Sequence, residues 1–109
     1  PGNDFDRVFK EGRRIARPEA VLIVSDPARP WPSPVNSVIR LGIVVGRKIM
    51  KEAVRRNRLR RILRESFRLH VKDLNPPPRD CILLVRPPAR ALKGRSDADA
   101  VVQKLLKRI

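Results

Sequence analysis

A run of arginines is the part of this sequence best suited to binding a charged ligand. Half of the residues between positions 55 and 68 are arginine: Arg55, Arg56, Arg58, Arg60, Arg61, Arg64 and Arg68. The planar guanidinium group donates paired hydrogen bonds to phosphate oxygens and stacks on bases. The chemistry that this run predicts is therefore recognition of a polyanion such as nucleic acid.

A solvated helix face is the simplest alternative explanation of the arginine run. Only Glu52 and Glu65 are available in this region to pair with the arginines. Positive charge near a helix N-terminus opposes the helix dipole and neighbouring like charges repel, each at about a few tenths of a kcal/mol. A sequence selected for stability alone would not collect these penalties, so we favour the ligand-binding interpretation.

Side chains that could catalyse a reaction are few and scattered. His70 is the only histidine, and Cys81, the only cysteine, lies in an apolar run that predicts a buried, unreactive thiol. Two close acidic pairs fall at predicted helix starts, where acids suit the helix dipole: Asp4 with Asp6, and Asp97 with Asp99. None of these groups resembles a two-metal nuclease centre, so we predict no catalytic residue and no metal site in this chain.

Positive charge extends beyond the arginine run to the whole chain. The 109 residues include 26 Lys and Arg against 11 Asp and Glu, a formal net charge of +15, and 41% are hydrophobic. This length suits a single domain over residues 1–109 with a modest core. The charge favours a polyanionic partner, for which nucleic acid is the first choice and an anionic membrane surface the second. Because neither a membrane span nor a signal peptide is recognisable, we expect a cytoplasmic protein.

Helices and short strands are predicted to position these residues. In chain order they are a helix over 3–11, an optional strand near 14–16, strands over 21–24 and 38–45, a helix over about 51–69, a strand over 81–85 and a helix from about 96. Asn3 or Asp4 would cap the first helix, and Ser96 or Asp97 the last. The order α-β-β-(β)-α-β-α predicts a small α+β fold with three to four strands.

Prolines and glycines predict the connections between these elements. Trp31 lies in a proline-rich loop over 27–34, the prolines at 75–78 end the long helix, and a linker covers 87–94. Gly12 is expected to stop the first helix.

The long predicted helix has an apolar stripe and a basic face. The stripe that would pack on the sheet comprises Leu59, Ile62, Leu63, Ser66 and Phe67. Asn57, Arg60, Arg61, Arg64 and Arg68 lie opposite, whereas Arg55 and Arg56 turn back toward the side of the stripe. A helix on a small sheet, without the second helix of a helix-turn-helix or a heptad zipper, suits structured RNA better than DNA.

The sequence resembles the ribonuclease P protein family of bacteria. Residues 56–69 resemble the family's signature helix, whose Arg-Asn-Arg motif corresponds here to Arg56, Asn57 and Arg58. Segments 4–12, 41–48 and 80–87 resemble three other parts of the family in the same order. The resemblance therefore covers nearly the whole chain.

The resemblance implies a function in tRNA maturation. Family members bind a catalytic RNA and help it to remove the 5′ leader of precursor tRNA, with Mg²⁺ bound mainly by the RNA. This chain would be a subunit of that endoribonuclease without catalytic residues of its own, and no membrane or obligate protein partner is expected. The resemblance also implies a left-handed βαβ crossover, against the usual right-handed preference.

The resemblance further implies two RNA-binding surfaces. The signature helix would contact the catalytic RNA through Arg55, Arg56, Asn57, Arg58, Arg60, Arg61, Arg64 and Arg68. A cleft between the first helix and the sheet would hold the leader through Phe5, Phe9, Arg13, Arg47 and Lys48. Since the chain has no tyrosine, stacking on the leader would depend on Phe5 and Phe9, for which packing in the core is an equal alternative.

Two other functions remain open from the residues alone. One is a ribonuclease or other RNA-modifying enzyme that acts without an RNA subunit. The other is a general basic RNA-binding module, such as a ribosomal protein.

Overall fold

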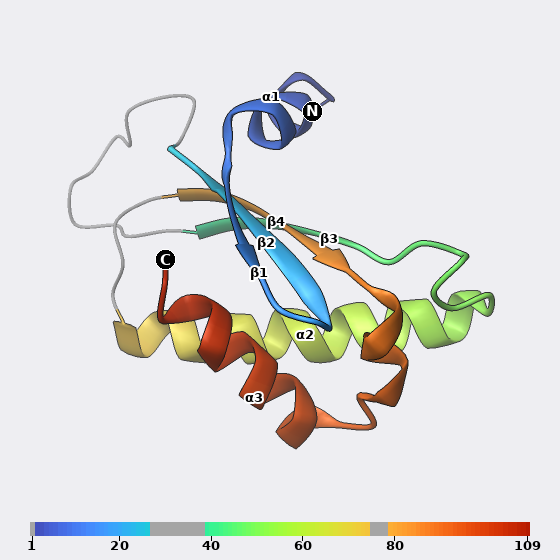
Figure 1. Ribbon diagram of the computed structural model, residues 1–109. Coiled ribbons are helices and arrows are strands. Elements are labelled where there is room, and N and C mark those ends of the chain that lie inside the picture. Colours follow the sequence, from blue (N-terminus) through green and yellow to red (C-terminus); the bar gives the residue numbers. More distant parts are fainter. Residues whose placement is uncertain (1, 27–38, 75–78) are drawn as a thin grey trace.

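The computed structural model describes residues 2–26, 39–74 and 79–109. Its elements, in chain order, are α1 (Gly2–Glu11), β1 (Arg13–Ala16), β2 (Ala20–Ser25), β3 (Ile39–Val44), α2 (Ala53–Leu74), β4 (Arg79–Val85), the 3-10 helix η1 (Pro87–Ala91) and α3 (Arg95–Leu106). The predicted α+β class and element order are confirmed, and the optional strand is present as β1 (Figure 1).

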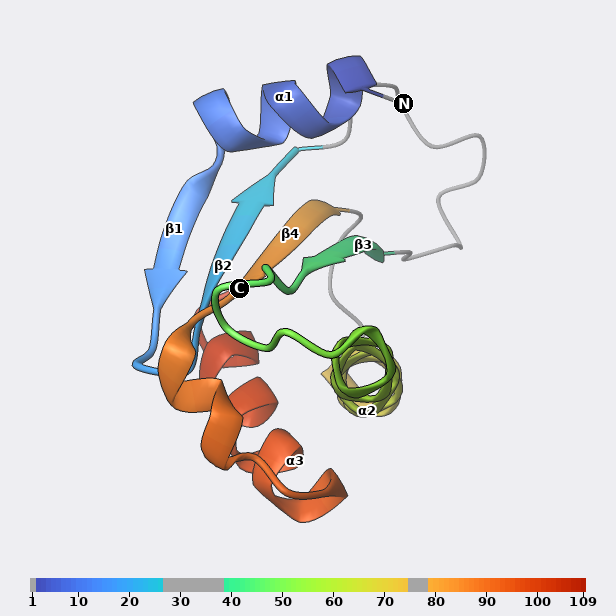
Figure 2. The ribbon, with the colours of Figure 1, turned by 90° about the vertical axis from the view of Figure 1, so that its right-hand side faces the viewer.

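The strands of the described residues form one mixed sheet in the order β1-β2-β4-β3. The β1–β2 and β2–β4 pairs are antiparallel, whereas β3 and β4 are parallel. Parallel neighbours need a crossover, and α2 provides it by running beneath the sheet (Figures 1 and 2). The two views show that this β3–α2–β4 connection is left-handed, as the resemblance implied and against the general rule.

Alternating side chains on the strands give the sheet two apolar faces. On β2, Leu22 and Val24 point to the face that α2 and α3 cover, while Val21 and Ile23 point to the face that α1 covers. Figure 2 shows this layering, with α1 above the sheet and the other two helices below it. Each fully buried large apolar side chain contributes about 1.5–3 kcal/mol, so the α2–α3 side supplies most of the stability.

The stripe on α2 packs as predicted. Leu59, Leu63 and Phe67 are buried against the sheet, and Ile62 is half-buried beside them. Ser66 is fully buried, and its hydroxyl donates to the Asp99 carboxylate of α3. This bond satisfies a polar group inside the apolar layer and joins α2 to α3.

Several predicted boundaries are wrong. α2 continues to Leu74 rather than ending near 69, because half-buried Val71 extends the apolar stripe by another turn. α1 begins at Gly2, so Asn3 and Asp4 lie inside the helix instead of capping it. The predicted linker over 87–94 contains η1, whose Ala89 is buried in the core. The predicted loop around Trp31 and the prolines at 76–78 lie outside the described residues.

The start of α3 also differs from its prediction. Gly94 is the N-cap residue and the helix starts at Arg95, so neither Ser96 nor Asp97 is the cap. Asp97 instead accepts a hydrogen bond from the Lys93 backbone N–H at 3.0 Å, from within the first turn. This hydrogen bond from the backbone before the helix to a side chain in its first turn stabilises the start of α3, as in a capping box.

Cys81 is buried in β4, as its apolar surroundings predicted. Burial raises the pKa of its thiol to about 12, and the neighbouring Asp80 carboxylate adds to the rise. The thiol is therefore protonated and unreactive in the folded chain. None of the helices in the described part of the chain has the length and hydropathy needed to cross a membrane.

We predict that Gly12→Ala destabilises the fold. A Cβ at Gly12 would lie 2.4 Å from Ile23 Cγ2 and 2.5 Å from the Val8 carbonyl oxygen, where α1 meets β2. Such overpacking costs about 1–3 kcal/mol, which urea unfolding would measure. Gly46→Ala is the control, because a Cβ there meets nothing within 4 Å. Equal stability of the two variants would contradict the close packing of α1 on β2.

Candidate nucleic-acid interface

The outer face of α2 carries an excess of positive charge. Its exposed residues include Arg55, Asn57, Arg58, Arg61, Arg64 and Arg68, while Arg56 and Arg60 are half-buried. Each nearby glutamate pairs with one arginine: Glu52 lies 3.9 Å from Arg55, and Glu65 lies 2.5 Å from Arg68. The helix therefore keeps a strong positive field after its ion pairs are formed, which suits a polyanion.

Arg56 and Arg60, two of the predicted contact residues on α2, make hydrogen bonds within the chain. Arg60 donates to the Asn57 side-chain oxygen at 2.8 Å, which orders both on the helix surface. The Arg56 guanidinium donates to the backbone carbonyls of Met50 at 3.0 Å and Lys51 at 2.6 Å. Arg56 therefore holds the segment that enters α2, in keeping with its predicted orientation toward the side of the stripe.

A second arginine holds the same segment from η1. Arg90 donates from Nε to the Ile49 carbonyl at 2.7 Å and from Nη2 to the Lys48 carbonyl at 2.8 Å. Together, Arg56 and Arg90 fix the backbone of residues 48–51 through four hydrogen bonds to carbonyl oxygens. We call residues 46–51 the basic turn.

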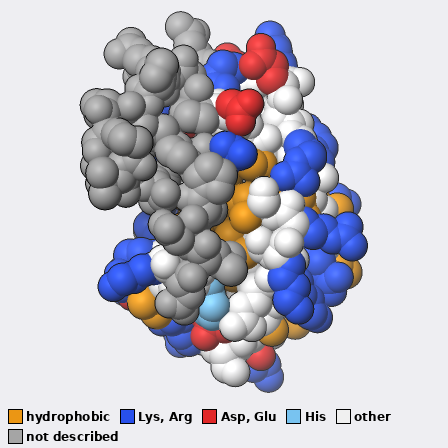
Figure 3. All heavy atoms as spheres, turned by 90° about the vertical axis from the view of Figure 1, so that its left-hand side faces the viewer, with side chains coloured by type: hydrophobic (Ala, Val, Ile, Leu, Met, Phe, Trp, Pro, Cys, Tyr) orange, Lys and Arg blue, Asp and Glu red, His pale blue; other side chains and the backbone are white. Residues whose placement is uncertain are grey.

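The basic turn presents Arg47 and Lys48 to solvent beside the start of α2. Both side chains are exposed, and the turn runs from the end of β3 to α2 on the side that faces the viewer in Figure 2. The structure therefore groups these two cations with the basic end of α2 as well as with the sheet. On the face shown in Figure 3, basic side chains cover a larger area than acidic ones.

The face of the sheet beside α1 has a partly exposed apolar area. Phe9 of α1, Val44 of β3 and Leu84 of β4 are half-buried and pack against the buried cluster of Val8, Val21, Ile23 and Ile82. Because Val44 pairs with Leu84 in the parallel register, the two side chains share this face. Phe9 thus has both a core contact and an exposed part, while the side chain of Phe5 lies outside the described part of α1.

Arg13 does not join this face. In β1 it pairs with Val24, whose side chain belongs to the α2–α3 side, and its guanidinium donates to the carbonyls of Arg108 at 3.0 Å and Ile109 at 3.3 Å. The neighbouring Arg14 pairs with Ile23 and therefore lies on the α1 side. The structure therefore does not bring Arg13 together with Phe9, because side chains alternate across a strand and Arg14 is the one on the α1 side.

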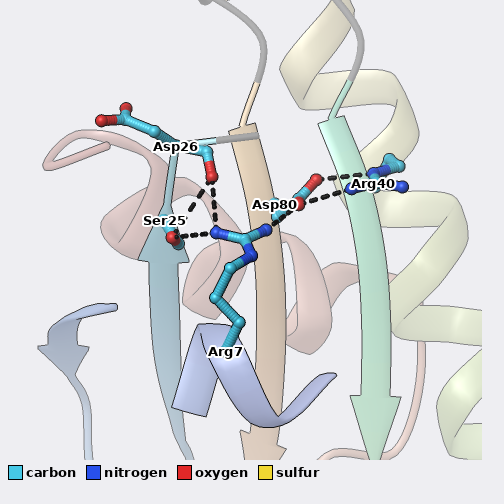
Figure 4. Close-up of polar contacts among 5 residues, drawn as sticks. All are labelled: Arg7, Ser25, Asp26, Arg40 and Asp80. Atoms are coloured by element: carbon cyan, nitrogen blue, oxygen red, sulfur yellow. Dashed lines mark hydrogen bonds and ion pairs between the residues drawn. The ribbon is translucent and has the colours of Figure 1, made fainter. Parts of the chain in front are cut away.

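A buried carboxylate organises the α1 side of the sheet. Asp80 of β4 is 3% exposed and accepts hydrogen bonds from Arg40 Nε and Nη2, both at 2.6 Å, in bidentate geometry. Its Oδ2 also accepts a hydrogen bond from Arg7 of α1. Arg7 donates in addition to the Ser25 hydroxyl at 2.9 Å and to the Asp26 carbonyl at 2.8 Å, at the end of β2 (Figure 4). One carboxylate thus connects α1, β2, β3 and β4.

The two arginines determine the charge state of Asp80. Burial by itself would raise the pKa of this carboxyl, but hydrogen bonds and charge from Arg40, with those of Arg7, lower it below its ordinary value. The carboxylate therefore stays ionised at neutral pH. It holds Arg40, whose side chain is 47% exposed, on the face that carries Val44.

The described residues do not supply the donors of a metal site. No three His, Cys, Asp or Glu side chains come together in this part of the chain. His70 donates from Nδ1 to the Ser66 carbonyl at 2.8 Å and lies 3.8 Å from the Asp99 carboxylate, so it is part of the α2–α3 contact. Asp99 itself is engaged by Ser66 and by Arg95, at 3.1 Å.

Sequence reasoning missed the residues that position the interface. They are Arg7, Arg14, Arg40, Asp80 and Arg90. Strand alternation could have assigned Arg14 and Arg40 to a face once the register was known. No local signal reveals the contacts of Arg7 with Asp80 or of Arg90 with the basic turn, because each joins segments that are far apart in the sequence.

Known proteins match this chain in sequence and in structure. A family model described as Ribonuclease P matches residues 2–109. A ribonuclease P protein component of Synechococcus sp. is 36% identical over 89 residues, covering 78% of this chain and 70% of that protein. A ribonuclease P protein component of Desulfotalea psychrophila is 41% identical over 88 residues, covering 79% of this chain and 64% of that protein. The solved RNase P protein from Thermotoga maritima in complex with 1-(4-fluorophenyl)-2-thiourea has a TM-score of 0.80 and 31% identity, covering 99% of this chain and 95% of that one. The solved Staphylococcus aureus RNase P protein has a TM-score of 0.78 and 27% identity, covering 99% of this chain and 90% of that one.

We predict that Asp80→Asn lowers the free energy of unfolding by about 2 kcal/mol at pH 7, because it weakens charge-assisted hydrogen bonds to two arginines. The pKa of Asp80 is lowered by folding, so its contribution is present above the unfolded pKa of about 3.9 and is lost as the pH falls through the folded value. The difference in the free energy of unfolding between the wild-type chain and Asp80→Asn should therefore be smaller in acid. Urea unfolding at pH 7 and pH 3 would measure it.

Asp26→Asn is the matched control for this prediction. Its side chain is 88% exposed and lies 3.5 Å from Arg79, an exposed pair worth about 0–1 kcal/mol. If Asp80→Asn lowers the free energy of unfolding no more than Asp26→Asn does, the organising role of Asp80 is contradicted.

Proposed function

Because this chain belongs to the bacterial ribonuclease P protein family, we propose that it binds the catalytic RNA of that endoribonuclease and the 5′ leader of precursor tRNA. In this proposal residues 1–109 act as one RNA-binding domain that assists removal of the leader. The single observation that carries it is the basic face of α2, whose charge exceeds what its two glutamates can pair.

The catalytic RNA contacts the basic face of α2. Exposed arginines follow the helix over several turns, so the face can meet several phosphates of a structured RNA without reading base sequence. The residues assigned to this contact are Arg55, Arg56, Asn57, Arg58, Arg60, Arg61, Arg64 and Arg68. Arg56 has a second task, because the carbonyls it holds belong to the turn that presents Arg47 and Lys48.

The leader lies on the α1 side of the sheet. Partly exposed Phe9, Val44 and Leu84 offer apolar surface to unstacked bases, and Phe5 belongs to the same helix as Phe9. Arg14 and Arg40 on this face, with Arg47 and Lys48 of the basic turn, supply positive charge for the leader phosphates. Arg13 is left out of this contact, since its guanidinium is bound to the C-terminal carbonyls.

The protein acts through electrostatics and positioning. Its cations offset the repulsion between two RNA molecules, and the sheet holds the leader in an extended path. The donor set in the described residues does not fit a protein-held Mg²⁺, so we place this ion with the RNA, where it would activate water and stabilise the leaving oxygen. No residue of this chain is assigned to bond cleavage.

Reconstitution with the catalytic RNA tests the proposal. At low Mg²⁺, where the RNA alone is slow, adding the chain should restore removal of the 5′ leader from precursor tRNA, because its cations replace part of the screening. Gel analysis of the cleaved tRNA measures the rate. A failure to stimulate the RNA would favour a general basic RNA-binding module, and cleavage by the protein alone would show a separate ribonuclease.

We predict that Arg58→Ala/Arg61→Ala flattens the salt dependence of binding to the catalytic RNA. Each lost phosphate contact should reduce the slope of log K against log salt by about 0.7–0.9, so two lost contacts reduce it by about 1.5. Filter binding at several salt concentrations measures the slope. Lys104→Ala/Lys107→Ala removes the same charge from the exposed side of the C-terminal helix and just beyond its end, and should leave the slope nearly unchanged. Equal slopes for the two double variants would contradict a contact through α2.

A further inference from the structure

A groove separates the edge strand β3 from the C-terminal half of α2. It has a volume of about 470 Å³, and its floor is formed by Ile39 and Leu41 of β3 with Phe67 and Val71 of α2. Its rim is formed by Arg64, Arg68 and Lys72 of α2. The groove lies on the opposite face of the sheet from α1, so it is separate from the surface assigned to the leader.

The strand register and the helix repeat explain the apolar floor. Leu41 pairs with buried Cys81, so Ile39 and Leu41 both project toward α2. Phe67 and Val71 are one helical turn apart and face them. Phe67 is 2% exposed, whereas the other three floor residues are only half-buried. Because β3 is the outermost strand of the sheet, no further strand of the described residues closes this side (Figure 2).

The rim is entirely cationic. Arg64, Arg68 and Lys72 follow one another at four-residue intervals, so the three charges form a row with a spacing of about 6 Å along the helix axis. Arg64 also donates to the Leu41 carbonyl at 3.2 Å, which ties the rim to the edge of β3. Glu65, an acidic residue beside the row, is paired with Arg68 and offsets part of its charge, but it is not part of the lining, so Arg64 and Lys72 keep their full charge toward the groove.

An apolar floor beside a row of cations matches the two halves of a nucleotide. A base needs apolar surface, while its phosphates need positive charge along a line. A peptide could pair with the outer edge of β3, but it would also need acidic side chains placed along the cations, whereas every nucleotide of an RNA strand carries a phosphate. The same helix also carries the surface that we assign to RNA, so an RNA strand bound there would reach the groove.

We propose that this groove takes up one unstacked nucleotide of a single-stranded stretch of RNA, with the base on Leu41, Phe67 and Val71 and the phosphates on Arg64, Arg68 and Lys72. This inference rests on the proposed function and extends it, because it adds a base contact to a surface otherwise assigned to phosphates alone.

Nuclear magnetic resonance of the wild-type chain tests the base contact. Titration with adenosine 5′-monophosphate should shift the methyl signals of Leu41 and Val71 upfield, since the ring current of a base acts on groups beneath its face. Ribose 5-phosphate carries the same charge without a base and should leave these signals nearly unchanged. The proposal is overturned if the nucleotide has no effect, if both ligands act equally, or if an acidic leucine-containing peptide shifts the signals and the nucleotide does not.

A pair of charge-matched variants tests the same contact in an RNA strand. Val71→Glu places a carboxylate in the groove, whereas Leu69→Glu adds the same charge two residues away, at an exposed position outside it. Val71→Glu should weaken binding of a uridine hexanucleotide about tenfold, the size of one lost base contact. Leu69→Glu should weaken it less than twofold. Equal effects of the two variants would overturn the proposal.

Folding and function are checked separately from the groove. Circular dichroism shows whether each variant is folded, and the titration of the wild-type chain remains decisive if Val71→Glu is not. Leader removal by the reconstituted enzyme tests the proposed function independently. If the reconstituted enzyme removes the leader but the nucleotide does not shift the methyl signals of Leu41 and Val71, the groove proposal is overturned and the proposed function stands.

Discussion

The arrangement of the α1 side of the sheet, one of the two surfaces that we propose to bind RNA, depends on one buried carboxylate. Asp80 accepts hydrogen bonds from Arg7 of α1 and Arg40 of β3, and Arg7 reaches the end of β2. A buried charge is unfavourable unless it is paired and hydrogen-bonded, so the four elements have to meet in one geometry. The contact stabilises the fold only modestly, but it specifies where α1 lies and which face Arg40 occupies. That face is the one assigned to the leader.

A chain with a net charge of +15 also has to fold against its own repulsion, and its arginines are divided between two uses. Arg7, Arg13, Arg40, Arg56 and Arg90 donate to carboxylates or backbone carbonyls within the chain. These contacts pair or hydrogen-bond the guanidinium groups. They also fix the backbone of the basic turn and the position of Arg40 on the α1 side of the sheet. Others, such as Arg58 and Arg61, remain on the outer face of α2. The arginines that make internal contacts thus hold the surfaces in place, and two of them, Arg40 and Arg56, are also among the residues that we propose to bind RNA.

Periodicity in the sequence predicts the local elements well and the distant contacts poorly. The apolar stripe of α2 and the strands around Leu22 and Cys81 follow from spacing alone, because each depends on neighbours one or two turns or pleats away. The contact of Arg90 with the basic turn joins residues more than forty positions apart, and no local pattern encodes it. The face of β1 on which Arg13 lies depends on strand alternation, and only the register with Val24 shows that it is the face opposite Phe9. The left-handed crossover was predicted from the resemblance, because the general preference for right-handed crossovers predicts the opposite hand.

The β3–α2–β4 crossover also affects the order in which the fold is completed during synthesis. β1 and β2 are adjacent in the sequence and can pair as soon as both leave the ribosome, whereas β3 has its only described strand partner in β4, which is made after the whole of α2. The edge of the sheet that carries the basic turn is therefore the last to gain its strand partner, and such non-local pairing is slow. The arginines of α2 are synthesised before β4, so the nascent chain carries most of its positive charge before its sheet can be completed.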